Sequence, residues 1–286
     1  MNTQFWLVQA FNGISYGALL FLVGSGLSLI FGVMRIVNLS HGSYFLLGGY
    51  IALSVIWTTG SWLLAIPVAA LVVAVLGMAM ERVFLQPLGF DPLRQVLLTV
   101  GFAFLFQQAA LDIWSGNNFD INPPDALTRS IVVGGLYLPL YRVFMIGMAA
   151  VIGLILWLVM EKTRIGAAVR ATVDDAQMAR GVGIDTSRIS MLIFSLGALL
   201  AALGGVIGGA FLGIYPGLDF EMLPIAFAVV IIGGMGSLGG AAIGALIVGL
   251  ADNFGKALFP ELSYFTLYAP MALILAVKPT GLFGRE

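Results

Sequence analysis

Long apolar runs follow one another along almost the whole chain, separated by short polar breaks. A helix needs about 20 mainly apolar residues to cross the hydrocarbon core of a bilayer. The pattern predicts such helices at 10–33, 41–57, 62–80, 95–112, 138–160, 189–212 and 262–278. We therefore expect an all-α, polytopic membrane protein of about eight membrane helices, including one broken or re-entrant segment, that forms a single transmembrane domain over residues 1–286.

The broken segment is the less regular stretch between the last two of these helices. It predicts a short helix at 220–232, a break at Gly233 and Gly234, and a longer helix at 238–254. Irregular backbone at membrane depth is tolerated only where protein or a water-filled cavity covers it. The break is thus a candidate cavity lining, and an ordinary tight turn outside the membrane explains it equally well.

Composition agrees with a membrane protein and argues against an enzyme. The chain is 60% hydrophobic and 9% charged, whereas soluble domains carry about 25% charged residues. Its net charge of −1 gives no basic surface for nucleic acid. It has no cysteine and a single histidine, and no HExxH, GxSxG or paired acid within a span. We therefore expect no catalytic residues, no metal and no cofactor. The N-terminus has no basic segment and no clear cleavage site, which favours a retained helix over a signal peptide.

Nine charged side chains gather in one soluble-looking segment, "EKTRIGAAVRATVDDAQMARGVGIDTSR", at 161–188. Helix-forming residues run through Met178 and Ala179, and Gly181 and Gly183 then end the pattern as a helix C-terminus would. A short mixed-charge helix between two spans is suited to docking into a groove on a soluble partner. The simpler alternative is a solvated loop.

The distribution of Lys and Arg predicts the orientation. If 161–188 is cytoplasmic, ten basic residues lie inside and three lie outside. The ten are Arg35, Arg82, Arg94, Lys162, Arg164, Arg170, Arg180, Arg188, Lys278 and Arg285, and the three are Arg129, Arg142 and Lys256. We expect a periplasmic N-terminus, a cytoplasmic C-terminus and a periplasmic loop at 113–137.

Asn38, Ser40 and His41 form a polar group directly before the Gly-rich apolar run that begins at Gly42. The Ser40 hydroxyl is suited to cap the following helix. The three residues are also suited to face a pathway at a helix N-terminus, whose free N–H groups attract polar or anionic ligands.

A weak internal repeat adds to the second interpretation. "GALL" occurs at 17–20 and at 197–200, in helices that we expect to run in opposite directions. Transporters often form their pathway between inverted repeats. Asn38–Gly42 and Gly233–Gly236 occupy similar places in the two copies, so we expect both to line one cavity.

Four segments resemble the permease subunits of branched-chain amino acid ABC importers. They are "MRIVNLSHGSYFLLGGYIA", "GAAVRATVDDAQMARGVGID", "VVIIGGMGSLGGAAIGALIVGLAD" and "VKPTGLFG", and the likeness runs over nearly the whole chain in order. One departure is that Ser43 and Tyr44 follow the "HG", where family members often carry an acidic or a small residue.

The resemblance implies an inner-membrane subunit without catalytic activity that works with a second permease, two cytoplasmic ATP-binding subunits and a periplasmic substrate-binding protein. It implies that the loop at 161–188 couples transport to the ATPases. The coupling residues it indicates are Arg170, Ala171, Asp174, Asp175, Ala179, Gly181, Gly183 and Ile184. The candidate pathway residues are Asn38, Ser40, His41, Gly42, Gly233 and Gly234. An importer of urea or short amides and a stand-alone channel are the alternatives.

Overall fold

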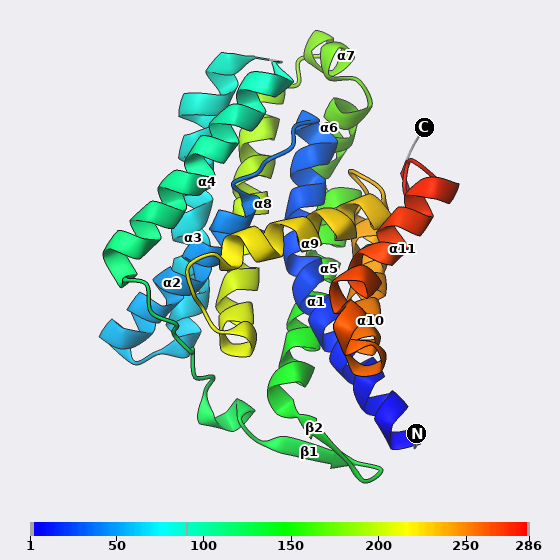
Figure 1. Ribbon diagram of the computed structural model, residues 1–286. Coiled ribbons are helices and arrows are strands. Elements are labelled where there is room, and N and C mark those ends of the chain that lie inside the picture. Colours follow the sequence, from blue (N-terminus) through cyan, green and yellow to red (C-terminus); the bar gives the residue numbers. More distant parts are fainter. Residues whose placement is uncertain (1–2, 90, 285–286) are drawn as a thin grey trace.

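The computed structural model describes residues 3–89 and 91–284, which form a helical bundle (Figure 1). Eleven α-helices make up most of these residues. They are α1 (Thr3–Met34), α2 (His41–Thr59), α3 (Trp62–Met80), α4 (Pro92–Trp114), α5 (Leu140–Lys162), α6 (Arg164–Asp174), α7 (Ala176–Gly181), α8 (Thr186–Leu212), α9 (Leu218–Gly233), α10 (Leu238–Leu258) and α11 (Ser263–Val277). A π-helix (Glu81–Leu85) and 3₁₀ turns at Gln86–Leu88, Asp125–Leu127 and Pro260–Leu262 join them.

Six of the helices in the described residues are long and apolar enough to cross a membrane: α1, α3 with its extension to Leu88, α4, α5, α8 and α10. The protein is therefore a polytopic, mostly helical membrane protein. Every helix expected from the hydrophobic pattern is present as a helix, with ends that differ by a few residues and by more at the start of α1. The expected number of about eight membrane helices is shown only in part, because α2, α9 and α11 are not among these six.

α1 and α8 form the centre of the bundle, where their backbones touch. A Cβ atom on Gly26 would lie 2.6 Å from the carbonyl oxygen of Gly197, so only glycine permits this approach. Around this pair, α10 packs on α1 and α3 packs on α8, while α2 packs on α8 and α9 on α1. α4 packs on α2 and α11 packs on α9.

The two ends of the bundle differ in character. The chain enters at one end with α1, and the same end carries residues 115–139 (Figure 1). We name it the hairpin end, because β1 (Ser130–Val133) and β2 (Leu136–Pro139) pair there as an antiparallel hairpin. The opposite end, which we name the α7 end, carries α6, α7 and the C-terminal segment. The sequence predicted that ten basic residues share one side. Nine of them belong to elements of the α7 end, and the tenth, Arg285, lies outside the described residues.

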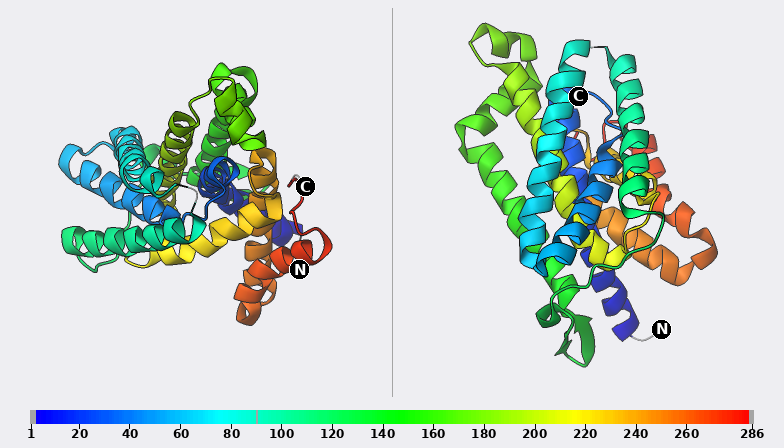
Figure 2. Two further views of the ribbon diagram at one scale, coloured as in Figure 1. Left: turned by 90° about the horizontal axis from the view of Figure 1, so that it is seen from above. Right: turned by 90° about the vertical axis from the view of Figure 1, so that its left-hand side faces the viewer.

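α2 and α9 are the two helices that begin inside the bundle. An irregular connection, 35–40, leads from the end of α1 back to α2, and another, 213–217, leads from α8 to α9. α9 then runs across the long direction of α1 and α8 (Figures 1 and 2). Both connections therefore carry the chain to the interior before the next helix starts.

Two expectations need correction. The prediction of helices alone missed the β1–β2 hairpin, whose turn has Gly134 and Gly135 at φ +58° and +82°. The segment 161–188 contains not one short helix but two, α6 and α7, together with the end of α5 and the start of α8. Asp175 separates the two short helices because its backbone is extended, at φ −153° and ψ 100°.

Candidate functional site

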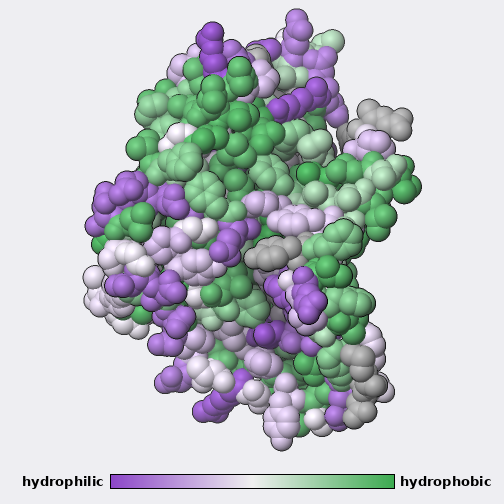
Figure 3. Space-filling model, viewed as in Figure 1, coloured by the Kyte–Doolittle hydropathy of each residue, from purple (hydrophilic) through white to green (hydrophobic). Residues whose placement is uncertain are grey.

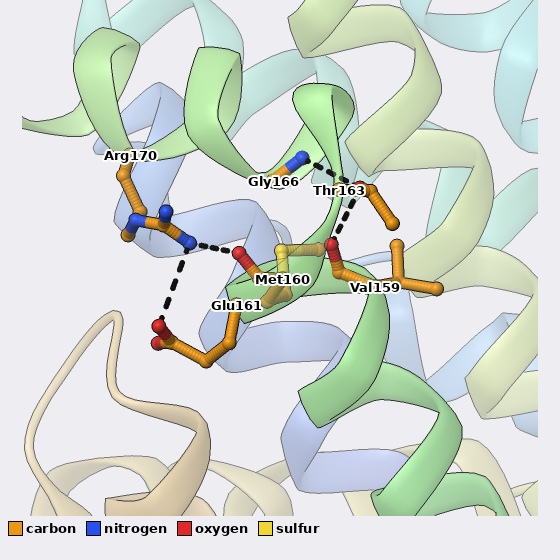
Figure 4. Close-up of polar contacts among 6 residues, drawn as sticks. All are labelled: Val159, Met160, Glu161, Thr163, Gly166 and Arg170. Carbon is orange, nitrogen blue, oxygen red and sulfur yellow. Dashed lines mark hydrogen bonds and ion pairs between the residues drawn. The ribbon is translucent and has the colours of Figure 1, made fainter.

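α5 and α6 meet in a tight elbow at the α7 end (Figure 4). Thr163 ends α5 and begins α6: its hydroxyl donates to the Val159 carbonyl at 2.6 Å and accepts from the Gly166 N–H at 3.2 Å. Gly166 lies directly on the last turn of α5, since a Cβ there would be 2.1 Å from the Met160 carbonyl oxygen. The elbow therefore fixes where α6 leaves the bundle.

Arg170, one of the predicted coupling residues, holds the other side of this elbow. Its guanidinium donates to the Met160 carbonyl and lies 3.8 Å from the Glu161 carboxylate (Figure 4). Met160 is at the end of α5, where helix carbonyls lack partners within the helix. Arg170 thus links α6 to the end of α5.

Asp175 caps α7. Its Oδ1 accepts hydrogen bonds from the N–H groups of Gln177 at 2.8 Å and Met178 at 2.9 Å. Asp174 ends α6 directly before it. A carboxylate at this position satisfies free backbone donors and lies at the positive end of the helix dipole. Asp175 of the predicted acidic pair therefore has a structural role in separating α6 from α7.

Gly183 ends α7 in a Schellman motif. Its N–H donates to the Arg180 carbonyl, and the N–H of Ile184 donates to the Ala179 carbonyl, both at 3.0 Å. Gly183 has φ +91°, which favours glycine. The predicted helix end at Gly183 is confirmed, whereas Gly181 lies within α7.

Not every residue in and directly after α7 faces outward. Ala179 is buried, with 3% of its surface exposed, so it packs inward and cannot be a contact for a partner. Met178 and Val182 take the outward positions, with 66% and 72% of their surfaces exposed. The sequence does not show this directly, because a six-residue helix is too short for its apolar spacing to define a face.

The predicted pathway group at Asn38, Ser40 and His41 is fully buried. Ser40 is the N-cap residue of α2, but its hydroxyl makes no capping bond and donates to Asn38 Oδ1 at 2.7 Å. His41 Nε2 lies 3.0 Å from the Val23 carbonyl in α1. Thr99 in α4 accepts from the Leu39 N–H at 3.2 Å. The group thus ties the connection 35–40 to α1 and α4.

Gly42 brings the start of α2 against the start of α9. A Cβ on Gly42 would lie 2.3 Å from the carbonyl oxygen of Asp219. Beside it, the Ser43 hydroxyl donates to Asp219 Oδ2 at 3.1 Å, and the Asp219 side chain is 2% exposed. The sequence analysis did not single out Asp219. An acid in the first turn of an apolar helix that follows "GIYPG" was the available signal.

Gly233 and Gly234 do not lie beside Gly42 and Asp219. They form the turn between α9 and α10 at the α7 end, where Gly233 packs on Gly240 and Gly234 packs on Gly284. The Leu282 and Phe283 N–H groups donate to the carbonyls of Ile232 and Gly233. In this structure the nearest neighbours of the two predicted breaks are different: Gly42 meets Asp219, whereas Gly234 meets the C-terminal segment. The structure gives the two predicted breaks different neighbours, and their lining of one cavity stays a prediction.

The sequence as a whole matches a family model described as the permease component of branched-chain amino acid transport systems, over residues 9–275. The chain belongs to this permease family. It is 32% identical to the high-affinity branched-chain amino acid transport system permease LivH of Escherichia coli, with 100% of this chain and 98% of the relative covered. It is 28% identical to the corresponding permease BraD of Pseudomonas aeruginosa over 98% of this chain and 96% of the relative.

A second kind of permease is also similar. LivM of Salmonella typhimurium, another permease of a high-affinity branched-chain amino acid transport system, is 27% identical over 91% of this chain and 67% of its own length. No solved structure was found to match. The family makes this permease a transport subunit without catalytic function.

Proposed function

We propose that the permease moves branched-chain amino acids through the bacterial inner membrane as one of two permease subunits in an ABC importer. Two cytoplasmic ATP-binding subunits would supply the energy and a periplasmic binding protein would deliver the substrate. The family match and the relatives LivH, BraD and LivM, whose names state this substrate class, support the proposal.

The outward face of α7 is the observation that carries the proposal. Val182 and Met178 are exposed apolar side chains beside the polar residues Gln177 and Arg180. The α7 end also holds most of the basic residues, which favours the cytoplasmic side. Contiguous exposed apolar patches mark contacts with a protein or a membrane, and Met178 and Val182 are the apolar side chains that this segment offers for one. A stand-alone channel has no use for such a surface, so we infer that α7 docks on an ATP-binding subunit.

An inverted repeat supports a transport path through the middle of the bundle. The unit α1–α2–α3–α4 corresponds to α8–α9–α10–α11: α3 packs on α8 as α10 packs on α1, and α4 packs on α2 as α11 packs on α9. Each central helix carries the "GALL" motif and precedes an irregular connection. We propose that the pathway passes where α2 and α9 begin, with Asn38, Ser40, His41 and Gly42 on one side and Asp219 on the other.

Uptake by the complete importer tests this function. The permease, purified with its native partners, is reconstituted into vesicles loaded with ATP and supplied with the binding protein and labelled L-leucine. We expect ATP-dependent uptake that unlabelled isoleucine and valine reduce and urea does not. Uptake of urea in place of leucine would contradict the proposed substrate class, and uptake without ATP would indicate a facilitator.

A further inference from the structure

α4 has little contact with the rest of this chain. In its apolar stretch 17% of the residues are buried, compared with 72% in α1 and in α8. α4 packs on α2 and on the π-helix that follows α3. The rings of Phe104 in α4 and Phe220 in α9 add one contact, with their centres 5.6 Å apart. Most of the surface of α4 therefore faces away from this chain.

One exposed face of α4 has the residue spacing of a helix that packs on another helix. Leu97, Gly101, Phe104 and Gln108 are exposed and follow one another at intervals of four, three and four residues, so they lie along one side of α4. We name these four residues the α4 stripe. Gly101 has no heavy atom within 4 Å of its Cβ position, so the stripe is open at its middle. Small residues at such places let two membrane helices approach closely.

Gln108 makes the α4 stripe poorly suited to lipid. Gln108 lies six residues before Trp114, the end of α4, which is about 9 Å along the helix axis and within the span. Its Nε2 donates to Asp112 Oδ1 at 2.9 Å, and both side chains are exposed. An amide also has a second N–H and a carbonyl oxygen to offer. In membranes, glutamine side chains hydrogen-bond from one helix to another.

α5 shows what a lipid-facing helix of this chain looks like. Its apolar stretch is 22% buried, nearly as little as that of α4. However, every exposed residue of α5 from Val143 to Leu158 is nonpolar. α4 and α5 lie on different sides of the bundle (Figure 2). The exposed face of α5 is therefore suited to lipid, whereas the polar group on the α4 stripe is suited to another membrane protein.

The α4 stripe borders the point where α9 begins. Phe220, the contact of Phe104, is 40% exposed, and the next residue, Glu221, is exposed and accepts from the Tyr215 hydroxyl at 2.8 Å. Figure 3 shows hydrophilic residues in the middle of this face, below an area that is mostly hydrophobic. Acids within a membrane face the interior of a bundle or a water-filled cavity rather than lipid. A second protein on the α4 stripe would keep lipid away from this region.

The comparisons indicate which protein this is. The chain is similar both to LivH and to LivM, two permeases of high-affinity branched-chain amino acid transport systems. We propose that the α4 stripe is the surface on which the second permease subunit of the importer packs, with one of its helices against Gly101 and a hydrogen bond to Gln108. This inference rests on the proposed function and adds the surface that joins the two permeases. The second subunit would then form the missing wall beside the start of α9.

Substitution of two matched glycines tests the surface. Gly101 in α4 and Gly147 in α5 both have no heavy atom within 4 Å of the Cβ position, so a larger side chain at either site does not crowd the backbone of this chain. The tagged permease is purified with its native partners, and the amount of second permease per tagged subunit is measured. We expect Gly101→Trp to lower this ratio at least ten-fold and Gly147→Trp to keep it within two-fold of wild type. A wild-type ratio in Gly101→Trp would overturn the inference.

A photocrosslink tests the same surface without disturbing it. The photoreactive residue p-benzoyl-L-phenylalanine replaces Leu97, which is 62% exposed on the α4 stripe, or Leu154, which is 56% exposed on α5. In membranes that contain the complete importer, we expect a covalent product from position 97 that contains peptides of the second permease, and none from position 154. A product with a second copy of this chain, or with lipid alone, would overturn the inference. A wild-type importer that contains no second permease would instead contradict the proposed function.

Discussion

Gly166 has no side chain, and this lets α6 pack directly on the last turn of α5. A Cβ at this position would lie within 2.5 Å of three backbone atoms of Val159 and Met160, and backbone cannot move aside as a flexible side chain can. We expect Gly166→Ala to destabilise the permease by about 1–3 kcal/mol, as overpacking does. The expected result is a lower midpoint of thermal unfolding in detergent.

Gly181→Ala is the matched control for this prediction. Gly181 lies at the end of α7 and has no heavy atom within 4 Å of its Cβ position. The alanine should leave the midpoint unchanged or raise it slightly, because alanine favours helix. Equal midpoints for the two variants would contradict the tight elbow.

Residues whose contacts are close in the sequence could be predicted, whereas residues whose contacts are distant in the sequence could not. Gly183 was predicted as a helix end from its neighbours, and the hydrogen bonds that Gly183 and Ile184 donate reach Arg180 and Ala179 within α7. Asp219 was not predicted, since its partner Ser43 is 176 positions away. Ala179 was predicted as a coupling residue and is buried, because only packing against the rest of the molecule shows which side of a short helix is buried.

At the scale of elements, the proposed docking of α7 predicts how the permease associates with the ATP-binding subunits. Val182 is 72% exposed, so Val182→Asp should leave the fold intact. A charge on an apolar docking surface must lose its hydration in the complex, which is costly. We expect at least a ten-fold loss of co-purifying ATP-binding subunit and a similar loss of leucine uptake.

The chain offers a control with the same chemical change. Val132 in β1 is 58% exposed at the hairpin end. Val132→Asp should retain wild-type association with the ATP-binding subunits. If Val182→Asp also retains it, α7 is a solvated loop and the docking surface lies elsewhere.

At the scale of elements, hydrophobic pattern predicted the long helices well and the connections poorly. A run of apolar residues long enough to span a bilayer has few other stable forms, because backbone groups in hydrocarbon must bond within the segment. The β1–β2 hairpin was missed although two glycines separate its strands, which is a turn signal. The start of α9 inside the bundle was not predictable, since it depends on where α8 and the connection 213–217 lie relative to α2.

At the scale of the whole molecule, the distribution of Lys and Arg along the chain predicted which segments lie at the same end of the bundle. The nine of these basic residues that the structure describes lie on elements of the α7 end, whereas Arg129 lies directly before β1, Arg142 at the start of α5 and Lys256 near the end of α10, toward the hairpin end. The reason is that charged side chains gather where helices leave hydrocarbon, and alternate loops leave on the same side. Which of these ends faces the cytoplasm is a separate question that a labelling experiment answers.

Single cysteines report the orientation without background, because the natural chain has none. Asn118 lies in the exposed loop at the hairpin end, and Gln177 is exposed on α7. We expect an impermeant thiol reagent added to intact spheroplasts to label Asn118→Cys and not Gln177→Cys, whereas both should be labelled after the membrane is permeabilised. The reason is that the excess of Lys and Arg at the α7 end retains that end in the cytoplasm. The reverse pattern in intact cells would place α7 outside, where no ATP-binding subunit could dock, and would contradict the orientation and the coupling role together.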